Sequence, residues 1–324
     1  MLFRSVGKHQ EALQAATNAV ELASQLGHRP LEIASSYNLA MVHHALGRYR
    51  DTIQIEEQIV TALSGDLETK RFGWSGFPSV FARTFLGNSL VELGEMDAAE
   101  RVILRGLHVA DQARDPYSQA MIYDTWGYYL NANERFGEAR SYLDSALTIC
   151  EEFAVPTMIP AVSAKLGEAL VGCGELALAS KVLEQAALPS CYRKGGRYTW
   201  FYLFKALTQL YLAQNDMEQA QSYAQKAYNL TQETGEAGHH GWSTLMLARV
   251  YALLGSPDHP QVLRLFDQAL DIAQQLGMHL LGFHVARAAA QYGERSQDAR
   301  LQIGYFDLAE HHARHLPAKP FQVH

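Results

Sequence analysis

The chain has little cysteine and no excess of basic residues. Its three cysteines, Cys150, Cys173 and Cys191, stand far apart and form no CxxC pair, so their spacing indicates neither a disulfide framework nor a zinc motif. The sequence contains 27 Lys and Arg against 34 Asp and Glu, a formal net charge of −7, and has no basic run. Because nucleic-acid binding depends on clustered cations, we do not expect nucleic acid as a partner.

Long apolar runs and catalytic motifs are also missing. No stretch approaches the roughly 20 residues that cross a bilayer, and the opening residues MLFRSVGKHQ lack the apolar core of a signal peptide. We therefore expect a cytoplasmic protein without a membrane partner. No GxxxxGK[ST] motif occurs, and residue spacing assembles no nucleophile, base and orienting residue. The sequence thus predicts a protein that is not an enzyme and that binds no metal or other cofactor.

What the chain does contain is a helical hairpin, clearest from Trp126 to Ala146. Apolar residues recur there every three or four positions in two successive runs, so each run is predicted to be a helix with one buried stripe. Gly127 and Ala139 are small where their neighbours are large. We expect the two helix axes to approach most closely at these residues.

Copies of this hairpin follow one another about 40 residues apart. The small residue of the second helix aligns at Ala12, Thr52, Ala99, Ala139, Ala179, Ala220, Val262 and Ala299. A single hairpin cannot bury its outer faces, so the copies are expected to stack. We predict one solenoid over residues 1–316, with an incomplete first hairpin and a degenerate last one, and a frayed tail over residues 317–324.

The first helices carry a matching large-small pair, at Leu39-Ala40, Leu86-Gly87, Trp126-Gly127, Leu166-Gly167, Leu207-Thr208 and Leu247-Ala248. In the last copy Ala286 and Arg287 replace this pair. The pattern resembles the tetratricopeptide repeat (TPR) family, in its variant with about 40 rather than about 34 residues per repeat, as in MalT-like regulators. The resemblance covers nearly the whole chain and implies an all-α, right-handed superhelical solenoid of stacked antiparallel hairpins.

One segment interrupts the period, from Arg71 to Arg83. Two glycines and Pro78 break a helix there, while its four aromatic residues would be poor residues to leave in water. We predict an ordered loop packed on the solenoid. This segment and the residues up to Gly94 resemble bacterial signalling proteins in which an adenylate or guanylate cyclase domain and an AAA-type NTPase precede a TPR region. That resemblance implies a regulatory context and supplies no catalytic residue.

Two smaller features carry expectations of their own. The first helix lacks a partner helix before it, so we expect it to expose an apolar stripe that includes Leu13, Ala16 and Val20. His311 and His315 would share a helix face, but no third metal ligand is placed and surface histidines are the favoured interpretation. The pair His239-His240 lies in a predicted turn, where helix packing is favoured over ligand contact.

The TPR resemblance also implies where a partner binds. In that family the first helices line the concave groove, two positions before, two after and five after the large residue of each pair. Carried onto this chain, the rule selects Tyr37, Thr84, Asn88, Asp124, Tyr128, Glu168, Lys205, Gln209, Leu245 and Arg249, with Asn131 one turn further along. The set is polar and aromatic, whereas a merely buried face would be aliphatic. Ordinary solvated helix positions are the alternative interpretation.

We therefore expect a non-catalytic module that binds a protein or peptide and serves as the regulatory or scaffolding part of a bacterial signalling protein. Its partner candidates include another domain of a longer parent chain. The alternative is a sensor of a small molecule or signalling peptide that controls an upstream cyclase, NTPase or transcription regulator. A closed polar pocket would favour the sensor and an open, continuous groove the scaffold. Lys205 and Arg249 opposite Asp124 would suit a ligand with both an acidic and a basic group.

Overall fold

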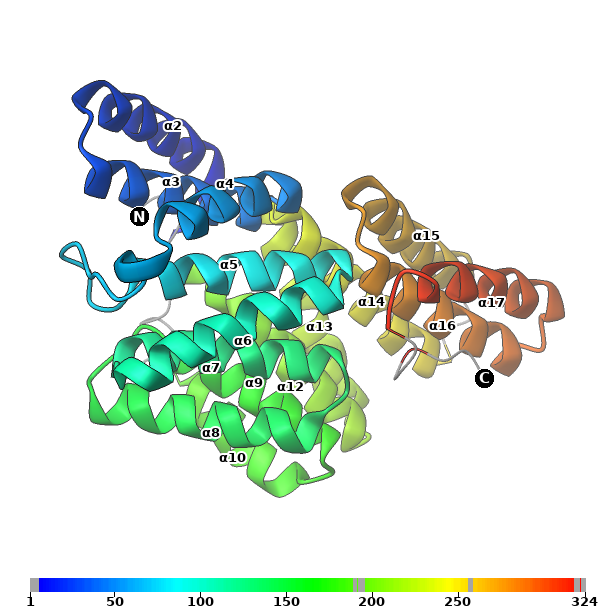
Figure 1. The fold of residues 1–324 in the computed structure, drawn as a ribbon. Coiled ribbons are helices and arrows are strands. Elements are labelled where there is room, and N and C mark those ends of the chain that lie inside the picture. The colour runs from blue at the N-terminus through cyan, green and yellow to red at the C-terminus, as the bar shows by residue number, and fades with distance from the viewer. Residues whose placement is uncertain (1–5, 189–190, 192–195, 256–258, 318–320, 322–324) are drawn as a thin grey trace.

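The computed structural model describes residues 6–188, 191, 196–255, 259–317 and 321, and within them the chain is all α without a strand (Figure 1). Two short 3-10 helices, η1 (Gly65–Leu67) and η2 (Arg197–Thr199), accompany fifteen α-helices. The α-helices are α2 (His9–Leu26), α3 (Arg29–Ala45), α4 (Tyr49–Ala62), α5 (Pro78–Leu93), α6 (Met96–Ala113), α7 (Pro116–Ala132), α8 (Phe136–Glu152), α9 (Ile159–Gly172), α10 (Leu176–Ala187), α12 (Trp200–Ala213), α13 (Met217–Thr234), α14 (Ala237–Leu253), α15 (His259–Leu276), α16 (His279–Arg295) and α17 (Ala299–Ala313).

After α2 the helices pair into hairpins, and the hairpins stack as a solenoid. The pairs are α3 with α4, α5 with α6, α7 with α8, α9 with α10, α12 with α13, α14 with α15 and α16 with α17. The turns inside the hairpins each contain a residue with a left-handed backbone, such as Gly94 at φ 82° after α5 and Glu134 at φ 55° after α7. This conformation ends a helix and lets the chain reverse.

The hairpins share one packing contact between a glycine and a branched side chain sixteen residues later. The pairs are Gly87 with Ile103, Gly127 with Leu143 and Gly167 with Leu183. A Cβ added to any of these glycines would overlap the branched side chain, so the helices can approach this closely only without one. Ala139 is fully buried in the same hairpin as Gly127. The predicted close approach of the two helices is confirmed at Gly127.

The helix bounds correct the register of the last repeat. From Ala12 to Val262, each aligned small residue is the fourth residue of its helix, whereas Ala299 is the first residue of α17. The fourth residue is Gln302, 40 positions after Val262, and its backbone lies against Gly293 of α16. The predicted alignment of Ala299 is therefore wrong by three residues. The helix itself begins on the period, since Ala299 follows His259, the first residue of α15, by 40 positions, and Asp298 caps this start by accepting the amides of Arg300 and Leu301. The error arises because Gln302, at the fourth position, is not a small residue.

The irregular segment is shorter than predicted. Residues 71–77 form an ordered loop, as expected, but Pro78 is the first residue of α5 rather than a helix breaker. Proline is well suited to this position because its missing N–H would be unpaired there anyway. The Trp74 ring lies 5.1 Å from that of Tyr37, and the amide of Phe77 donates to Ser118 Oγ at 2.9 Å. The loop therefore packs on the first hairpins of the solenoid.

The two ends of the chain are better covered than the sequence indicates. Ala16 of α2 is buried, because α3 packs on that face, so the expected exposed stripe is wrong at this residue. Leu13 and Val20 are half-buried. Phe321, in the segment expected to be a frayed tail, is buried and its ring centroid lies 5.4 Å from that of Phe283; residues 318–320 and 322–324 lie outside the described part.

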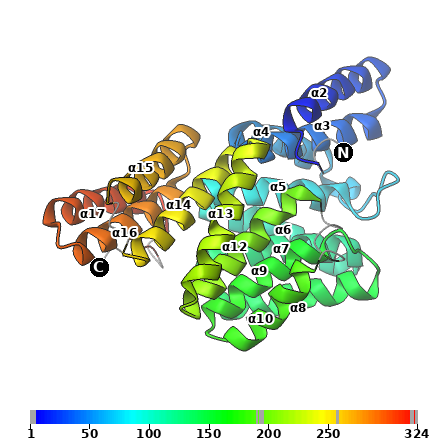
Figure 2. The ribbon, with the colours of Figure 1, turned by 180° about the vertical axis from the view of Figure 1, so that it is seen from behind.

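The solenoid winds back on itself, so that hairpins far apart in the sequence touch. Seen from both sides, α13 and α14 run past α4 and α5 (Figures 1 and 2), and α16 contacts α5. His9 Nε2 in α2 donates to the buried carboxylate of Glu236 at 2.9 Å, and His239 Nδ1 donates to its other oxygen at 2.8 Å. Burial alone would raise the pKa of Glu236, but the hydrogen bonds from His239 and His9 lower it to about 2.

One core position holds a charged residue type. Glu56 is the eighth residue of α4, the position occupied by Ile103, Leu143 and Leu183 in the next three second helices. Its side chain is fully buried, and among the described residues neither carboxylate oxygen has a hydrogen-bond partner. Burial raises the pKa of Glu56 well above its usual value. Burial therefore favours the neutral form of this carboxyl in the folded protein.

We predict that Ala139→Leu lowers the free energy of unfolding by about 1 to 3 kcal/mol, because the extra carbons overpack a position with no free space. Chemical denaturation measures this change. Ala15→Leu, at an exposed position of α2, serves as the matched control and should have little effect. Equal stability of the two variants would show that the hairpin packing described above is wrong.

We predict that Glu56→Leu stabilises the fold at pH 8 by about 1 to 3 kcal/mol, the usual cost of a buried polar group without a partner. Since the folded-state pKa is raised, the unfolded chain releases this proton first, and stability is lost as pH rises above the ordinary carboxyl range. Denaturation curves at pH 8 and pH 5 should therefore differ less in Glu56→Leu than in the wild type. Exposed Glu57→Leu is the control, and an unchanged pH dependence in Glu56→Leu would contradict the assignment.

Candidate ligand-binding site

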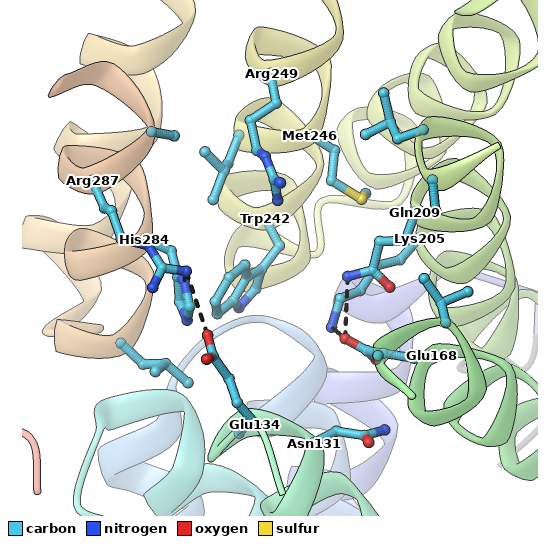
Figure 3. Close-up of a pocket in the computed structure, with 18 of the residues that line it drawn as sticks. Asn131, Glu134, Glu168, Lys205, Gln209, Trp242, Met246, Arg249, His284 and Arg287 are labelled. Atoms are coloured by element: carbon cyan, nitrogen blue, oxygen red, sulfur yellow. Dashed lines mark hydrogen bonds and ion pairs between the residues drawn. The ribbon is translucent and has the colours of Figure 1, made fainter. Parts of the chain in front are cut away.

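A cavity of about 570 Å³ lies between α14 and α16, the first helices of the last two hairpins, and the helices of the middle hairpins (Figure 3). Its walls come from α7, α9, α12, α14 and α16, and the turn after α7 closes one side. The lining residues are Tyr128, Asn131, Ala132, Glu134, Phe136, Glu168, Val171, Gly172, Lys205, Gln209, Leu212, Ala213, Trp242, Leu245, Met246, Arg249, Leu253, Leu280, His284, Arg287, Ala288 and Gln291. Five hairpins thus contribute to one site.

The structure divides the residues that the TPR rule selects into two groups. Those that line the cavity are Tyr128, Asn131, Glu168, Lys205, Gln209, Leu245 and Arg249. Tyr37, Thr84, Asn88 and Asp124 do not line it. Tyr37 is buried under the Trp74 ring, and Thr84 is buried with its hydroxyl donating to the Phe81 carbonyl at 2.6 Å. Asp124 pairs with Lys165 at 2.6 Å instead of facing Lys205 and Arg249.

Sequence reasoning missed the residues that α16 supplies. Gln302 takes the position that a small residue holds in the other repeats. The second residue of the preceding pair lies twelve positions earlier in most hairpins, which here gives Ala289-Ala290. The same rule of two before and two after then selects Arg287 and Gln291, and both line the cavity. The signal was therefore present and was lost through the three-residue error in register.

On one wall of the cavity the charges compensate each other. Lys205 Nζ lies 2.8 Å from Glu168 Oε1, and Gln209 Nε2 donates to the same oxygen at 3.2 Å. The Lys205 ammonium also lies 5.6 Å from the centre of the Trp242 ring. Figure 3 shows this cluster on α9 and α12, facing the side chains from α14. This side of the pocket is polar but carries no excess charge.

The opposite wall carries arginines. Arg287 Nη2 lies 3.4 Å from Glu134 Oε1 and 3.3 Å from His284 Nδ1. Burial, together with the nearby charges of Arg287, Arg249 and Lys205, lowers the pKa of His284 well below its usual value, so this imidazole is neutral. Arg249 extends from α14 into the pocket, and among the described residues it has neither a carboxylate nor a hydrogen-bond partner. Partial desolvation inside the cavity, together with the charges of Arg287 and Arg295, lowers the pKa of Arg249, although the residue as a whole is exposed to solvent.

Two amide oxygens in the cavity also lack partners. Asn131 donates its Nδ2 to the Lys165 carbonyl at 2.9 Å, which leaves Asn131 Oδ1 buried and unbonded. Gln209 donates its amide to Glu168, and Gln209 Oε1 is likewise buried without a partner. More than nine in ten buried polar groups in folded proteins are hydrogen-bonded. Among the described residues, these two oxygens border the cavity and are acceptors for any N–H or O–H group that enters it.

A buried carboxylate behind the cavity holds its walls together. Glu92 of α5 is 1% exposed and accepts the hydroxyl of Tyr128 from α7 and the indole N–H of Trp242 from α14, the latter at 3.0 Å. Tyr128 and Trp242 both line the pocket. Glu92 thus holds Tyr128 of α7 and Trp242 of α14 against α5, although Trp242 lies 150 positions away in the sequence.

Within the described residues, no group of three or more His, Cys, Asp or Glu side chains is arranged to hold a metal ion. The His311 and His315 rings lie 5.6 Å apart and contact each other at an exposed site. His239 stacks on Phe201 with 4.1 Å between ring centres and is buried, which confirms helix packing for this residue. Of the helices that the structure describes, none is both long and apolar enough to cross a membrane.

The stacked hairpins define a TPR-like helical-repeat solenoid. Residues 1–64 match the sequence model of the tetratricopeptide repeat family. No curated protein sequence matches the chain. Among solved structures, a Rap protein in complex with Competence and Sporulation Factor has a TM-score of 0.68 at 12% identity, over 95% of this chain and 86% of that one. This likeness shows the fold.

Two further solved structures are more distant. The apo form of RapI has a TM-score of 0.48 at 11% identity, over 89% of this chain and 78% of that one. A signal transduction ATPase with numerous domains and a tetratricopeptide repeat sensor, from Pyrococcus horikoshii, has a TM-score of 0.46 at 15% identity, over 91% of this chain and 43% of that one.

We predict that Glu92→Leu lowers the free energy of unfolding by about 1 to 3 kcal/mol, because the Tyr128 hydroxyl and the Trp242 N–H lose a buried acceptor. The emission spectrum of tryptophan should shift as well, since Trp242 loses its hydrogen bond. Exposed Glu218→Leu on α13 is the control for removing a carboxylate. If Glu92→Leu is as stable as the wild type, Glu92 does not hold the cavity walls.

Proposed function

We propose that the chain is a non-catalytic module that binds a short peptide, or a peptide segment of a partner protein, in the 570 Å³ cavity. The observation that carries this proposal is the pair of buried, unpaired amide oxygens of Asn131 and Gln209. A peptide backbone presents N–H donors at regular spacing, and such acceptors can fix its orientation. In this proposal the solenoid spans residues 1–316 and is the regulatory or scaffolding part of a bacterial, cytoplasmic signalling protein.

The size and lining of the cavity support a short ligand over a folded domain. Sites for small ligands usually measure about 300 to 1,000 Å³ and combine an apolar wall with a few placed polar groups. Here Trp242, Met246 and Leu253 offer apolar surface on α14, while the amides lie on α7 and α12. An open groove along the whole solenoid would suit a scaffold better, but Tyr37 and Thr84, at its beginning, are buried.

The similar Rap structure adds support of a different kind. That protein was solved in complex with Competence and Sporulation Factor, and 95% of this chain superposes on its fold. The same arrangement of hairpins is therefore compatible with a bound factor. We extend this to our chain as a sensor role: a peptide that fills the cavity would contact five hairpins at once and stabilise their arrangement.

We predict that the purified chain retains peptides from an equimolar pool of random hexapeptides in equilibrium dialysis read by mass spectrometry. Asn131→Leu and Gln209→Leu should each weaken retention about 2- to 10-fold, the effect of one neutral hydrogen bond. Asn229→Leu, at an exposed position of α13, is the matched control and should retain peptides as the wild type does.

Two outcomes would contradict this function. If the wild type retains no peptide, the cavity is not a peptide site. If retention survives both cavity substitutions but is lost in Trp74→Ala, the binding surface is the loop before α5 instead.

A further inference from the structure

We propose that Arg249 is the specificity-determining residue of the cavity and that it binds a carboxylate of the ligand. This inference rests on the proposed peptide-binding function. It goes beyond that function, because it states which chemical group the peptide must carry and where in the cavity that group lies. A carboxylate comes either from the C-terminus of the peptide or from an acidic side chain, and the experiment below separates these two sources.

The charges that line the cavity do not balance. Three cations and two carboxylates line it. Lys205 is compensated by Glu168 at 2.8 Å and Arg287 by Glu134 at 3.4 Å, which leaves Arg249 uncompensated among the lining residues. The whole chain carries a net charge of −7, so an excess cation in this cavity does not follow from a basic surface.

The charged groups around Arg249 are repulsive. Arg249 is exposed to solvent at the cavity, and the two cations that act on it, Arg287 and Arg295, both lie on α16. Among the described residues, no carboxylate pairs with the guanidinium. Like charges that repel each other without a counter-charge raise the free energy of the site. A bound anion would lower it.

The shape and position of the Arg249 guanidinium suit a carboxylate. A guanidinium presents N–H donors in a planar fork that matches a carboxylate with two parallel hydrogen bonds. Arg249 reaches the space between α12 and α16 from α14, so that its fork is accessible from the cavity (Figure 3). Asn131 and Gln209 lie on other helices of the same cavity. One extended peptide can therefore reach these amide oxygens with its backbone and Arg249 with its carboxylate.

A second cavity of about 290 Å³ shares Arg249, Leu253, Ala288 and Gln291 with the first. The second cavity extends toward Phe266, Arg295 and the carboxylate of Glu294. An acidic side chain projecting from the middle of a peptide has room here, as does a terminal carboxylate. The shared requirement is the negative charge at Arg249.

The experiment uses three synthetic hexapeptide pools with the full chain in equilibrium dialysis. The first pool lacks Asp and Glu and has free C-termini, the second has the same sequences as C-terminal amides, and the third is amidated but contains one central Glu. We expect the wild type to prefer the first or third pool to the second about tenfold or more, and Arg249→Met to lose this preference. Arg264→Met, at an exposed position of α15, should behave as the wild type.

The results of the dialysis distinguish a failure of the Arg249 assignment from a failure of the peptide-binding function. Equal retention of all three pools, unchanged in Arg249→Met, overturns the inference and leaves the peptide-binding function standing. No retention of any pool by the wild type overturns both. If inorganic phosphate raises the melting temperature of the wild type but not of Arg249→Met, while the carboxylate pools are not preferred, the anion is a phosphate and the assignment of a carboxylate is wrong.

A second measurement excludes a merely structural role. Because the charges that lower the pKa of Arg249, those of Arg287 and Arg295, repel it, Arg249→Met without a ligand should melt at the same temperature as the wild type or at a higher one. A lower melting temperature of the ligand-free variant would show that Arg249 stabilises the fold itself, and this would contradict the inference.

Discussion

The buried carboxylate of Glu92 is the contact on which the binding cavity depends. It accepts hydrogen bonds from Tyr128 on α7 and from Trp242 on α14, although these residues follow it by 36 and 150 positions. A stack of hairpins that touch only their neighbours would leave α14 free to move relative to α5. Glu92 instead closes the turn of the superhelix and converts a concave face into a bounded pocket.

The polar groups of this fold divide according to whether the protein pairs them. Those that close the solenoid, Glu92 and Glu236, are buried with both oxygens bonded. In the cavity, the amide oxygens of Asn131 and Gln209 are buried without a partner among the described residues, and the exposed Arg249 has no partner there either. Buried atoms also stay unpaired outside the cavity, as at Glu56 and Asn88, so what distinguishes these two amides is the space that they face.

Local pattern predicted much of the fold, and long-range closure could not be predicted. The period of small residues located the hairpins, because each helix buries one stripe against its partner, as Gly127 does against Leu143. The same pattern failed in the last repeat, where Gln302 rather than a small residue takes the fourth helix position, and this error hid Arg287. Tyr37 was selected by a rule for the groove, but the loop with Trp74 covers it. The contact of Glu92 with Trp242 depends on small rotations summed over several hairpins, which no local spacing records.

Hydrogen exchange with and without the retained peptides is the most direct test of the account, because it reports on every hairpin at once. If the peptide lies in the cavity, protection should increase together in the C-terminal half of α7, in α12 and in α14, which come from three different hairpins and all line the pocket. Protection confined to the loop before α5, or to one hairpin alone, would contradict a site at which the solenoid closes around its ligand.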